Sequence, residues 1–215
     1  MLAAVAAAPA APGRPVVVEL FTSQGCSSCP PAEAFLSELA RDRADVLALS
    51  WHVTYWNGLG WPDPFSLPAA TDRQRRYAAL LPADVYTPQM VVDGTADVVG
   101  FDRGRALAAI AAAAAAHRGG PALAVSCRAG QATITLGAGE GVADILVLGY
   151  DREHRTAVGS GENEGRTLTG SNIVRALATV GTWRGVAQRI VVPVPQGERL
   201  AVLLQAPDGR MLGVA

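Results

Sequence analysis

The sequence VVVELFTSQGCSSCPP, at residues 16–31, decides the fold of this chain. It opens with a β-branched, apolar run that predicts a buried strand, and a polar turn containing Gly25 follows. Cys26 and Cys29, separated by two small residues, then stand at the start of a helical pattern over residues 31–41. The partial positive charge and unpaired N–H groups of a helix N-terminus favour a thiolate over a thiol. The segment therefore predicts a dithiol–disulfide site at a strand-to-helix turn.

The two prolines that follow the cysteines modify this prediction. A proline disfavours helical backbone angles at the residue before it. We therefore expect Cys29 to precede the regular helix, with Pro30 and Pro31 in the first turn. Cys26 would then lie further from the helix terminus, with less stabilisation of its thiolate.

The order strand, turn, C-x-x-C and helix resembles the opening of a thioredoxin-like domain. The longer string FTSQGCSSCPPAE, at residues 21–33, resembles an uncharacterised bacterial family of thioredoxin-like proteins that is often predicted to be secreted. That family is known only as a domain of unknown function. The thioredoxin-like resemblance covers residues 16–118, about half of the chain.

The resemblance implies roles for particular residues. It makes Cys26 the exposed nucleophile and Cys29 the thiol that resolves the mixed disulfide. It also implies a cis peptide bond before Pro88, so that the Thr87 backbone offers an edge to a substrate peptide. Thioredoxin-like proteins often have a buried acid near the second cysteine, and Glu19 is the only carboxylate in the first expected strand. Glu19 stands one residue further from Cys26 than is common, so a Glu paired with an Arg or with solvent is the alternative.

The rest of the first half of the chain fits this order of elements. After the cysteine helix we expect a buried strand, an aromatic loop, a helix opened by Thr71 or Asp72, a hairpin turning at Asp93-Gly94, and a last helix. These elements fall at residues 45–51, 52–68, 71–81, 89–100 and 101–117.

The sequence Gly-Gly-Pro at residues 119–121 predicts a domain boundary. Beyond it apolar residues alternate with a period of two, which is typical of short antiparallel strands. The expected strands are residues 123–127, 131–136, 143–150, 155–159, 187–194, 200–205 and 211–214, and residues 171–177 are either a helical turn or another strand. We therefore predict an Ala-rich leader or signal remnant (1–15), a thioredoxin-like α/β domain with a central mixed sheet flanked by helices (16–118), and an all-β, sandwich-like C-terminal domain (121–215).

Three further features could contribute to a site. His52 follows the second expected strand and could act as a proton relay or metal ligand, although a lone histidine is more often a packing residue. Cys127 alternates in phase with Leu123, which predicts that it points into the core of the β domain. The polar loop at residues 161–166 either folds over the cysteines and supplies Asn163 or Arg166, or is a surface turn.

Composition narrows the function. The chain has 215 residues, half of them apolar, a net charge of −1 and no basic patch, so we expect no nucleic-acid partner. Three cysteines are too few for a disulfide framework and suit a redox pair with one spare thiol. No stretch reaches transmembrane length. An oxidising compartment would suit the pair, so we expect a periplasmic or secreted protein.

These observations favour an enzyme of the thiol–disulfide oxidoreductase type, with a protein or small-thiol disulfide as substrate and no cofactor other than the disulfide itself. Two alternatives remain open. Cys26, Cys29 and His52 could bind or deliver copper(I), which needs fewer ligands than a tetrahedral zinc site. Alternatively, the disulfide is structural in a non-catalytic interaction module, which an inaccessible Cys26 would favour.

Overall fold

The first half of the chain alternates strands and helices, and the computed structural model describes residues 14–117 and 119–215. The expected leader, residues 1–15, lies outside this range except for its last two residues. The elements are β1 (Val16–Thr22), α1 (Pro30–Asp42), β2 (Val46–His52), α2 (Pro68–Leu80), β3 (Gln89–Val92), β4 (Ala96–Val99) and α3 (Arg103–Ala116). β1 pairs in parallel with β2 and antiparallel with β3, and β3 pairs antiparallel with β4. This is the order of elements that the sequence predicts.

One detail of this half differs from the expectation, and another agrees with it closely. α2 begins at Pro68 and not at Thr71 or Asp72, because the Thr71 hydroxyl is used by the preceding loop, where it accepts from the backbone N–H of Thr54. The turn between β3 and β4 lies at Asp93 and Gly94, as expected, and both have positive φ. A Cβ on Gly94 would lie 1.8 Å from the carbonyl oxygen of Gly209, so only glycine fits there.

The second half of the chain contains strands only. They are β5 (Leu123–Arg128), β6 (Gln131–Leu136), β7 (Ala143–Ala157), β8 (Thr167–Trp183), β9 (Gln188–Pro193), β10 (Arg199–Gln205) and β11 (Met211–Val214). The separate strands expected at residues 143–150 and 155–159 are one long strand, β7, and residues 171–177 belong to β8. β7 and β8 pair along almost their whole length. Register shifts after Ile145 and Gly149 interrupt the alternation of apolar and polar residues, so the sequence does not show one continuous strand.

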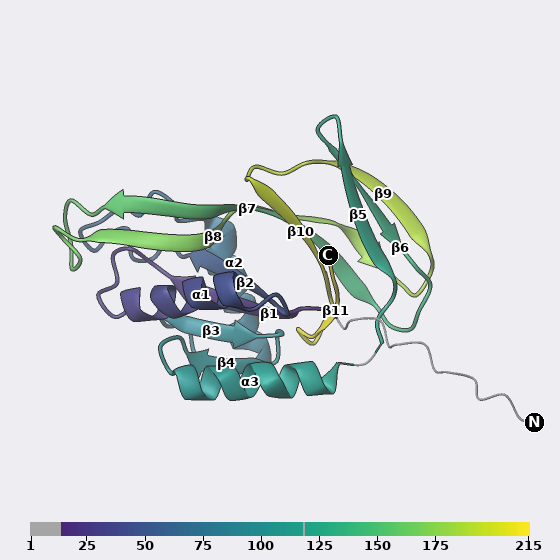
Figure 1. The fold of residues 1–215 in the computed structure, drawn as a ribbon, viewed down its shortest axis with the longest axis horizontal. Coiled ribbons are helices and arrows are strands. Elements are labelled where there is room, and N and C mark those ends of the chain that lie inside the picture. The colour runs from purple at the N-terminus through teal and green to yellow at the C-terminus, as the bar shows by residue number, and fades with distance from the viewer. Residues whose placement is uncertain (1–13, 118) are drawn as a thin grey trace, which may run out of the picture.

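The strands form two sheets. The larger has eight strands in the order β11-β10-β7-β8-β2-β1-β3-β4, and the smaller has three in the order β5-β6-β9. β8 joins the first half of the chain by pairing in parallel with β2 where Ser50 lies opposite Ile173, so the large sheet continues across the expected boundary at residues 119–121. Figure 1 shows the three-stranded sheet at the end of the molecule away from the helices. Among the described residues, no helix is long and apolar enough to cross a membrane.

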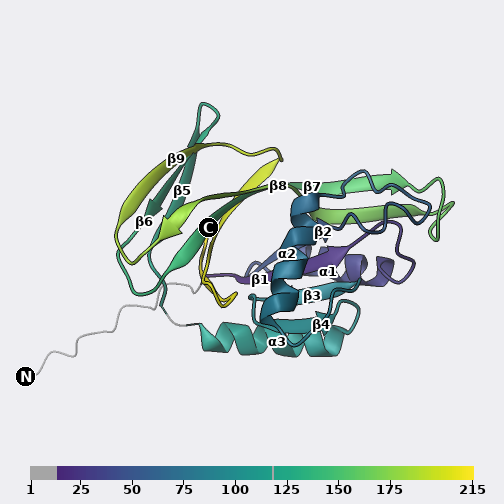
Figure 2. The ribbon, with the colours of Figure 1, turned by 180° about the vertical axis from the view of Figure 1, so that it is seen from behind.

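Helices cover both faces of the large sheet beside β1. Alternate residues of β1 pack on opposite sides: Val18 and Leu20 lie against α1 and α3, whereas Val17 and Phe21 lie in the cluster that contains α2. Figure 2 shows α2 in front of the strands, on the side opposite α1. The small sheet has its own contact with the large one, in a cluster formed by side chains of β6, β7 and β10.

Glu19 lies in phase with Val17 and Phe21, so it faces α2. Its carboxylate accepts two hydrogen bonds from Arg73, at 2.5 Å and 2.9 Å, and another from the Tyr77 hydroxyl. Gln205 of β10 bonds to both Arg73 and Tyr77. All four side chains are buried. Of the two alternatives for Glu19, the structure therefore has the carboxylate paired with an arginine. The network connects β1, α2 and β10.

This network predicts a large loss of stability when Arg73 is replaced. Arg73→Met keeps most of the side-chain volume but leaves the Glu19 carboxylate buried without its cation, which should cost about 3–5 kcal/mol of unfolding free energy. Urea unfolding monitored by circular dichroism would measure it. Arg75→Met on the same helix is the matched control. Arg75 is exposed and pairs with exposed Asp72, so its loss should cost about 0.5 kcal/mol or less. An equal effect of the two variants would contradict the assignment.

Candidate functional site

Cys26 and Cys29 form a disulfide, with 5.4 Å between their Cα atoms. Cys29 is the N-cap residue of α1, and Pro30 and Pro31 occupy the first helical turn, as the sequence predicts. The Cys29 carbonyl oxygen accepts from the backbone N–H of Ala32 and of Glu33. The disulfide therefore lies at the positive end of the helix dipole.

Both cysteines are buried, and the expectation that Cys26 is exposed is wrong. Cys26 has no exposed surface and Cys29 has 1 %. The physical reason is the loop at residues 158–166, between β7 and β8. The side-chain amide of Asn163 donates to the carbonyl oxygens of Gln24 and Cys26, each at 2.9 Å.

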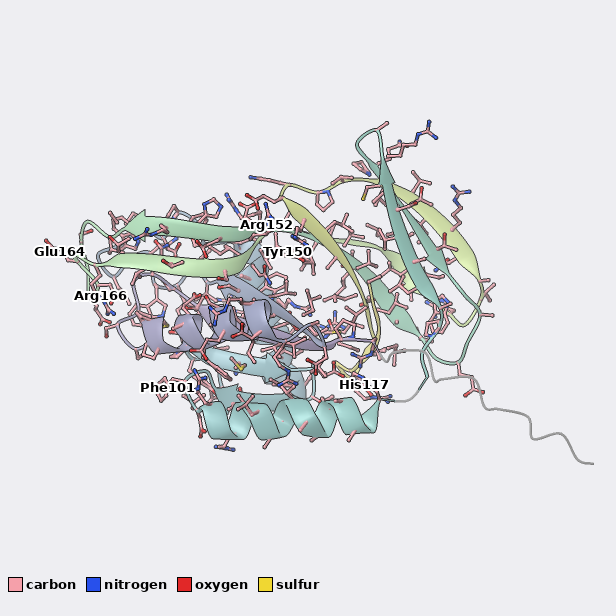
Figure 3. The ribbon with its side chains drawn as sticks, in the orientation of Figure 1. Phe101, His117, Tyr150, Arg152, Glu164 and Arg166 are labelled. Atoms are coloured by element: carbon pink, nitrogen blue, oxygen red, sulfur yellow. A yellow bond between two sulfur atoms is a disulfide. The ribbon has the colours of Figure 1, made fainter. Side chains whose placement is uncertain are left out.

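Further contacts hold this loop down. The Glu162 carboxylate accepts from the backbone N–H of Ser27 at 2.9 Å, and the Arg166 guanidinium donates to Asn163 at 2.7 Å. Figure 3 shows Glu164 and Arg166 at the free end of the β7–β8 hairpin. Of the two alternatives for residues 161–166, the structure has the loop folded over the cysteine segment, with Asn163 at the contact. We call residues 151–173, the outer part of this hairpin with its loop, the arm.

The arm also contacts the aromatic loop that follows β2. The Ser160 hydroxyl donates to the carbonyl oxygen of Gly60, and Thr156 bonds to the side chain of Gln24. Gly161, at φ +78°, lies so close to this loop that a Cβ there would be 3.2 Å from the Trp61 Cβ. Close backbone contact therefore fixes the arm at more than one place.

A cavity of about 580 Å³ lies between α1 and the arm, and Cys29 lines it whereas Cys26 does not. Its walls come from the cysteine loop, from α1, from the end of β2 and from the arm. The lining residues are Ser23, Gln24, Cys29, Pro30, Glu33, Ala34, Ser37, Glu38, Arg41, His52, Glu153, Arg166, Thr167, Leu168, Thr169 and Gly170. The cavity gives the Cys29 side of the disulfide a neighbouring space of small-molecule size.

Glu33 is a site residue that the sequence analysis did not identify. It lies one helical turn after Cys29 and lines the same cavity, with a side chain that is 13 % exposed. The Ser50 hydroxyl donates to its carboxylate at 3.2 Å. Burial raises the pKa of Glu33 even though His52 and Ser50 lower it. The spacing of four residues from Cys29, which places two side chains on one helix face, was the signal in the sequence.

His52 connects this acid to a second carboxylate. Its Nδ1 donates to Asp63 at 2.7 Å, and its Nε2 lies 3.6 Å from Glu33 without a hydrogen-bond partner among the described residues. Burial lowers the pKa of His52, but the charges of Asp63 and Glu33 outweigh it and raise the pKa above its ordinary value. Burial likewise opposes ionisation of Asp63, but His52 and the backbone amides of Gln24 and Phe65 lower its pKa. The pKa of Asp63 is thus lowered, whereas those of His52 and Glu33 are raised.

The remaining predicted site residues lie elsewhere. The Thr87–Pro88 peptide bond is cis, as expected, but neither residue lines the cavity. The Thr87 hydroxyl accepts from the indole N–H of Trp56 at 2.8 Å. Glu19 is in the network with Arg73 described above and is likewise not among the cavity residues. Of the predicted residues, Cys29, His52 and Arg166 therefore meet at one site.

The prediction that Cys127 points into the core is wrong, because Cys127 is exposed. It lies one residue before the end of β5, next to the turn at Ala129 and Gly130, where the sheet no longer covers it. Within residues 14–117 and 119–215, no group of three His, Cys, Asp or Glu side chains is arranged to hold a metal ion.

Comparisons with known proteins extend over nearly the whole chain. The family model described as protein of unknown function (DUF1223) matches residues 17–205. The crystal structure of a protein from Agrobacterium tumefaciens is 32% identical, with a TM-score of 0.79, over 96% of this chain and 95% of that chain. HBP35 of Porphyromonas gingivalis is 13% identical, with a TM-score of 0.63, over 94% of this chain and 74% of that chain, which shows similarity of fold alone. The search of curated proteins found no match. The family match includes both the cysteine segment and the arm.

The contacts of Asn163 predict that the arm controls access to Cys26. In the reduced protein, Asn163→Ala should raise the rate of Cys26 alkylation by iodoacetamide about tenfold, because two buried hydrogen bonds are lost. The rate at Cys29 should change little. Peptide mass spectrometry would locate the label. Glu164→Ala, in the same loop and exposed, is the control and should leave both rates unchanged. A Cys26 rate in Asn163→Ala equal to that of the control would show that other contacts seal the thiol.

The raised pKa of Glu33 predicts a pH dependence of stability. A group whose pKa is raised on folding contributes stability below its unfolded pKa of 4.5 and loses it as the pH rises through the folded pKa. Glu33→Gln should therefore flatten the fall in unfolding free energy above about pH 4.5 and leave the protein at least as stable at neutral pH. Urea unfolding at a series of pH values measures this. Glu140→Gln, at an exposed position, should follow the wild type, and a Glu33→Gln curve that does the same would contradict the role given to burial.

Proposed function

This chain belongs to the DUF1223 family of proteins of unknown function, and we propose that it catalyses thiol–disulfide exchange through Cys26 and Cys29. One observation carries the proposal: the disulfide lies at the N-terminus of α1, and its Cys29 side lines a cavity together with Glu33 and His52. A structural disulfide needs neither a cavity nor titratable groups beside it.

The proposal includes a thioredoxin-like unit at residues 16–118. The parallel pair of β1 and β2, the antiparallel hairpin of β3 and β4, the C-x-x-C before α1 and the cis bond at Thr87–Pro88 support it. Residues 121–215 supply strands alone, which supports a β-rich second part. In this protein the second part would do more than pack against the first, because its arm forms one wall of the cavity.

The chemistry follows from thiolate attack on a disulfide. A substrate thiolate attacks one sulfur of the protein disulfide, the other protein sulfur leaves as a thiolate, and a second thiol then releases the substrate. The helix N-terminus stabilises a thiolate at Cys29. Glu33, whose pKa is raised, can accept the proton of a thiol or return it in the reverse reaction. The same steps run in either direction, as the reduction potentials of the protein and its substrate dictate.

Export to the periplasm or the cell exterior is part of the proposal. Disulfides persist in oxidising compartments, so the bond between Cys26 and Cys29 supports export.

One observation favours a second candidate function. Cys26 is fully buried and sealed by Asn163, as a structural disulfide in a non-catalytic interaction module would be. The two candidates differ in the reduction potential that they require, since structural disulfides resist reduction.

The reduction potential of the disulfide therefore tests the proposal. The exposed Cys127 is first replaced by serine (Cys127→Ser), so that Cys26 and Cys29 are the only cysteines that can be trapped. Equilibration of the folded protein with reduced and oxidised dithiothreitol or glutathione, followed by trapping of free thiols, gives the potential. Catalytic exchange predicts a value between about −120 and −270 mV, whereas a value below about −300 mV would identify a structural bond. Unfolded protein, equilibrated with the same buffers in denaturant, is the reference for a disulfide without its native surroundings.

A further inference from the structure

We propose that the cavity beside Cys29 binds a zwitterionic, amino-acid-derived thiol of low molecular weight, or its disulfide, and that exchange starts at Cys29. This inference rests on the proposed function and adds the class of substrate and the sulfur that it attacks.

Both cysteines are buried, but their surroundings differ. The arm seals Cys26 through Asn163 and Glu162, whereas Cys29 lines the cavity of about 580 Å³. This volume is typical of sites for small molecules. Residues 167–170 of the arm form the wall opposite α1, so a folded protein would need the arm to move before its disulfide reached Cys29. A small reactant does not need that movement.

The charges on the cavity wall match a zwitterion. Two guanidinium groups, Arg41 and Arg166, and two exposed carboxylates, Glu38 and Glu153, line it. Glu38 is already paired with Arg103, and Arg41 with its neighbour Asp42. Glu153 makes no ion pair within the described part of the chain. Arg166 uses one N–H for Asn163 and keeps others for a ligand carboxylate. A ligand with one carboxylate and one ammonium would complement both signs, and a neutral thiol would use neither.

Two groups in the cavity lack partners that such a ligand could supply. The Nε2 atom of His52 is buried without a hydrogen-bond partner among the described residues, and His52 lines the cavity. At residues 167–170 the inner edge of β8 has no strand partner within the described chain, because the ladder between β8 and β2 there is limited to the pair Ser50–Ile173. Residues 167–170 therefore present strand backbone to the cavity, and the amide groups of an amino-acid or peptide ligand can pair with it.

The reaction balances with two equivalents of the thiol. The thiolate of the first molecule attacks the Cys29 sulfur, a mixed disulfide forms at Cys29, and the bond to Cys26 breaks. Cys26 leaves as a thiolate, and the Ser28 hydroxyl, 3.3 Å from its sulfur, can donate to it. A second thiolate attacks the ligand sulfur of the mixed disulfide, which releases the oxidised ligand and the Cys29 thiolate. The protein gains two electrons, and the protons lost by the two thiols return to Cys26 and Cys29.

Rates of reduction test the inference on the oxidised, full-length Cys127→Ser protein. The probes are reduced glutathione, which is a zwitterionic peptide thiol, and 2-mercaptoethanol, which is neutral. The quantity of interest is the ratio of their second-order rate constants, because intrinsic thiol reactivity cancels when variants are compared. Arg166→Gln and Glu153→Gln should each lower the ratio about fivefold through a smaller glutathione rate. Arg189→Gln, at an exposed position on β9, should leave it unchanged. An unchanged ratio in both cavity variants would overturn the inference.

A competitor and a trapped intermediate complete the test. S-methylglutathione cannot exchange, so by occupying the cavity it should slow reduction by 2-mercaptoethanol, and no slowing would again overturn the inference. Incubation with oxidised glutathione should form a mixed disulfide faster at Cys29 in Cys26→Ser than at Cys26 in Cys29→Ser, whereas the reverse order would overturn the choice of sulfur. If neither thiol reduces the native disulfide, the proposed exchange function fails. If both thiols reduce it without any effect of the cavity variants, only the substrate class fails.

Discussion

The antiparallel pairing of β7 with β8 is the interaction on which the rest of this structure depends. Its inner part, where Ala143 lies opposite Trp183, belongs to the large sheet and, together with β10, packs against β6 of the small sheet. Its outer part, where Ala157 lies opposite Thr167, extends beyond the one position at which β8 pairs with β2 in the sheet. Because the hydrogen-bond ladder runs through both parts, the same two strands that join the halves of the chain also hold the arm over the cysteines.

Glu19, which is buried, and Glu33, which is half-buried, have different roles because the pleat and the helix direct them to opposite sides. Glu19 is in phase with the β1 residues that face α2, where Arg73 supplies a bidentate cation and Tyr77 a further donor. Its charge is thus fully compensated, and its contribution is to stability. Glu33 projects from α1 on the opposite side, where it meets the Ser50 hydroxyl and a histidine that already pairs with Asp63. Burial without full compensation raises its pKa, which is the property a proton-transfer group needs.

The sequence predicted those features of the structure that are specified by residues close together in the chain. The β-branched run, the C-x-x-C before two prolines, the Asp93-Gly94 turn and most strand positions are encoded by neighbouring residues, and the structure confirms them. The errors arise where distant segments meet. The burial of Cys26 depends on Asn163, more than a hundred positions away, and a polar Gly-rich loop gives no local sign of which surface it covers. Cys127 has the alternation of a core residue, but it lies at the end of a strand that the neighbouring elements do not cover. Glu33 could have been identified as a site residue from its four-residue spacing to Cys29. Its proximity to His52 could not have been predicted without the register of β1 and β2.

In the proposed exchange, the sealed position of Cys26 also constrains the direction of the reaction at the level of single atoms. Attack on a disulfide places the incoming sulfur, the attacked sulfur and the leaving sulfur close to one line, so a nucleophile in the cavity that attacks Cys29 directs the departing electrons to Cys26. The leaving thiolate then forms beneath the arm, beside the Ser28 hydroxyl and away from bulk solvent. Burial disfavours a thiolate unless donors compensate it, so the sealed position makes Cys26 the poorer leaving group and favours re-formation of the disulfide. Under this proposal the arm would determine redox poise as well as access, because the contacts that exclude large partners also set the environment in which the thiolate would form.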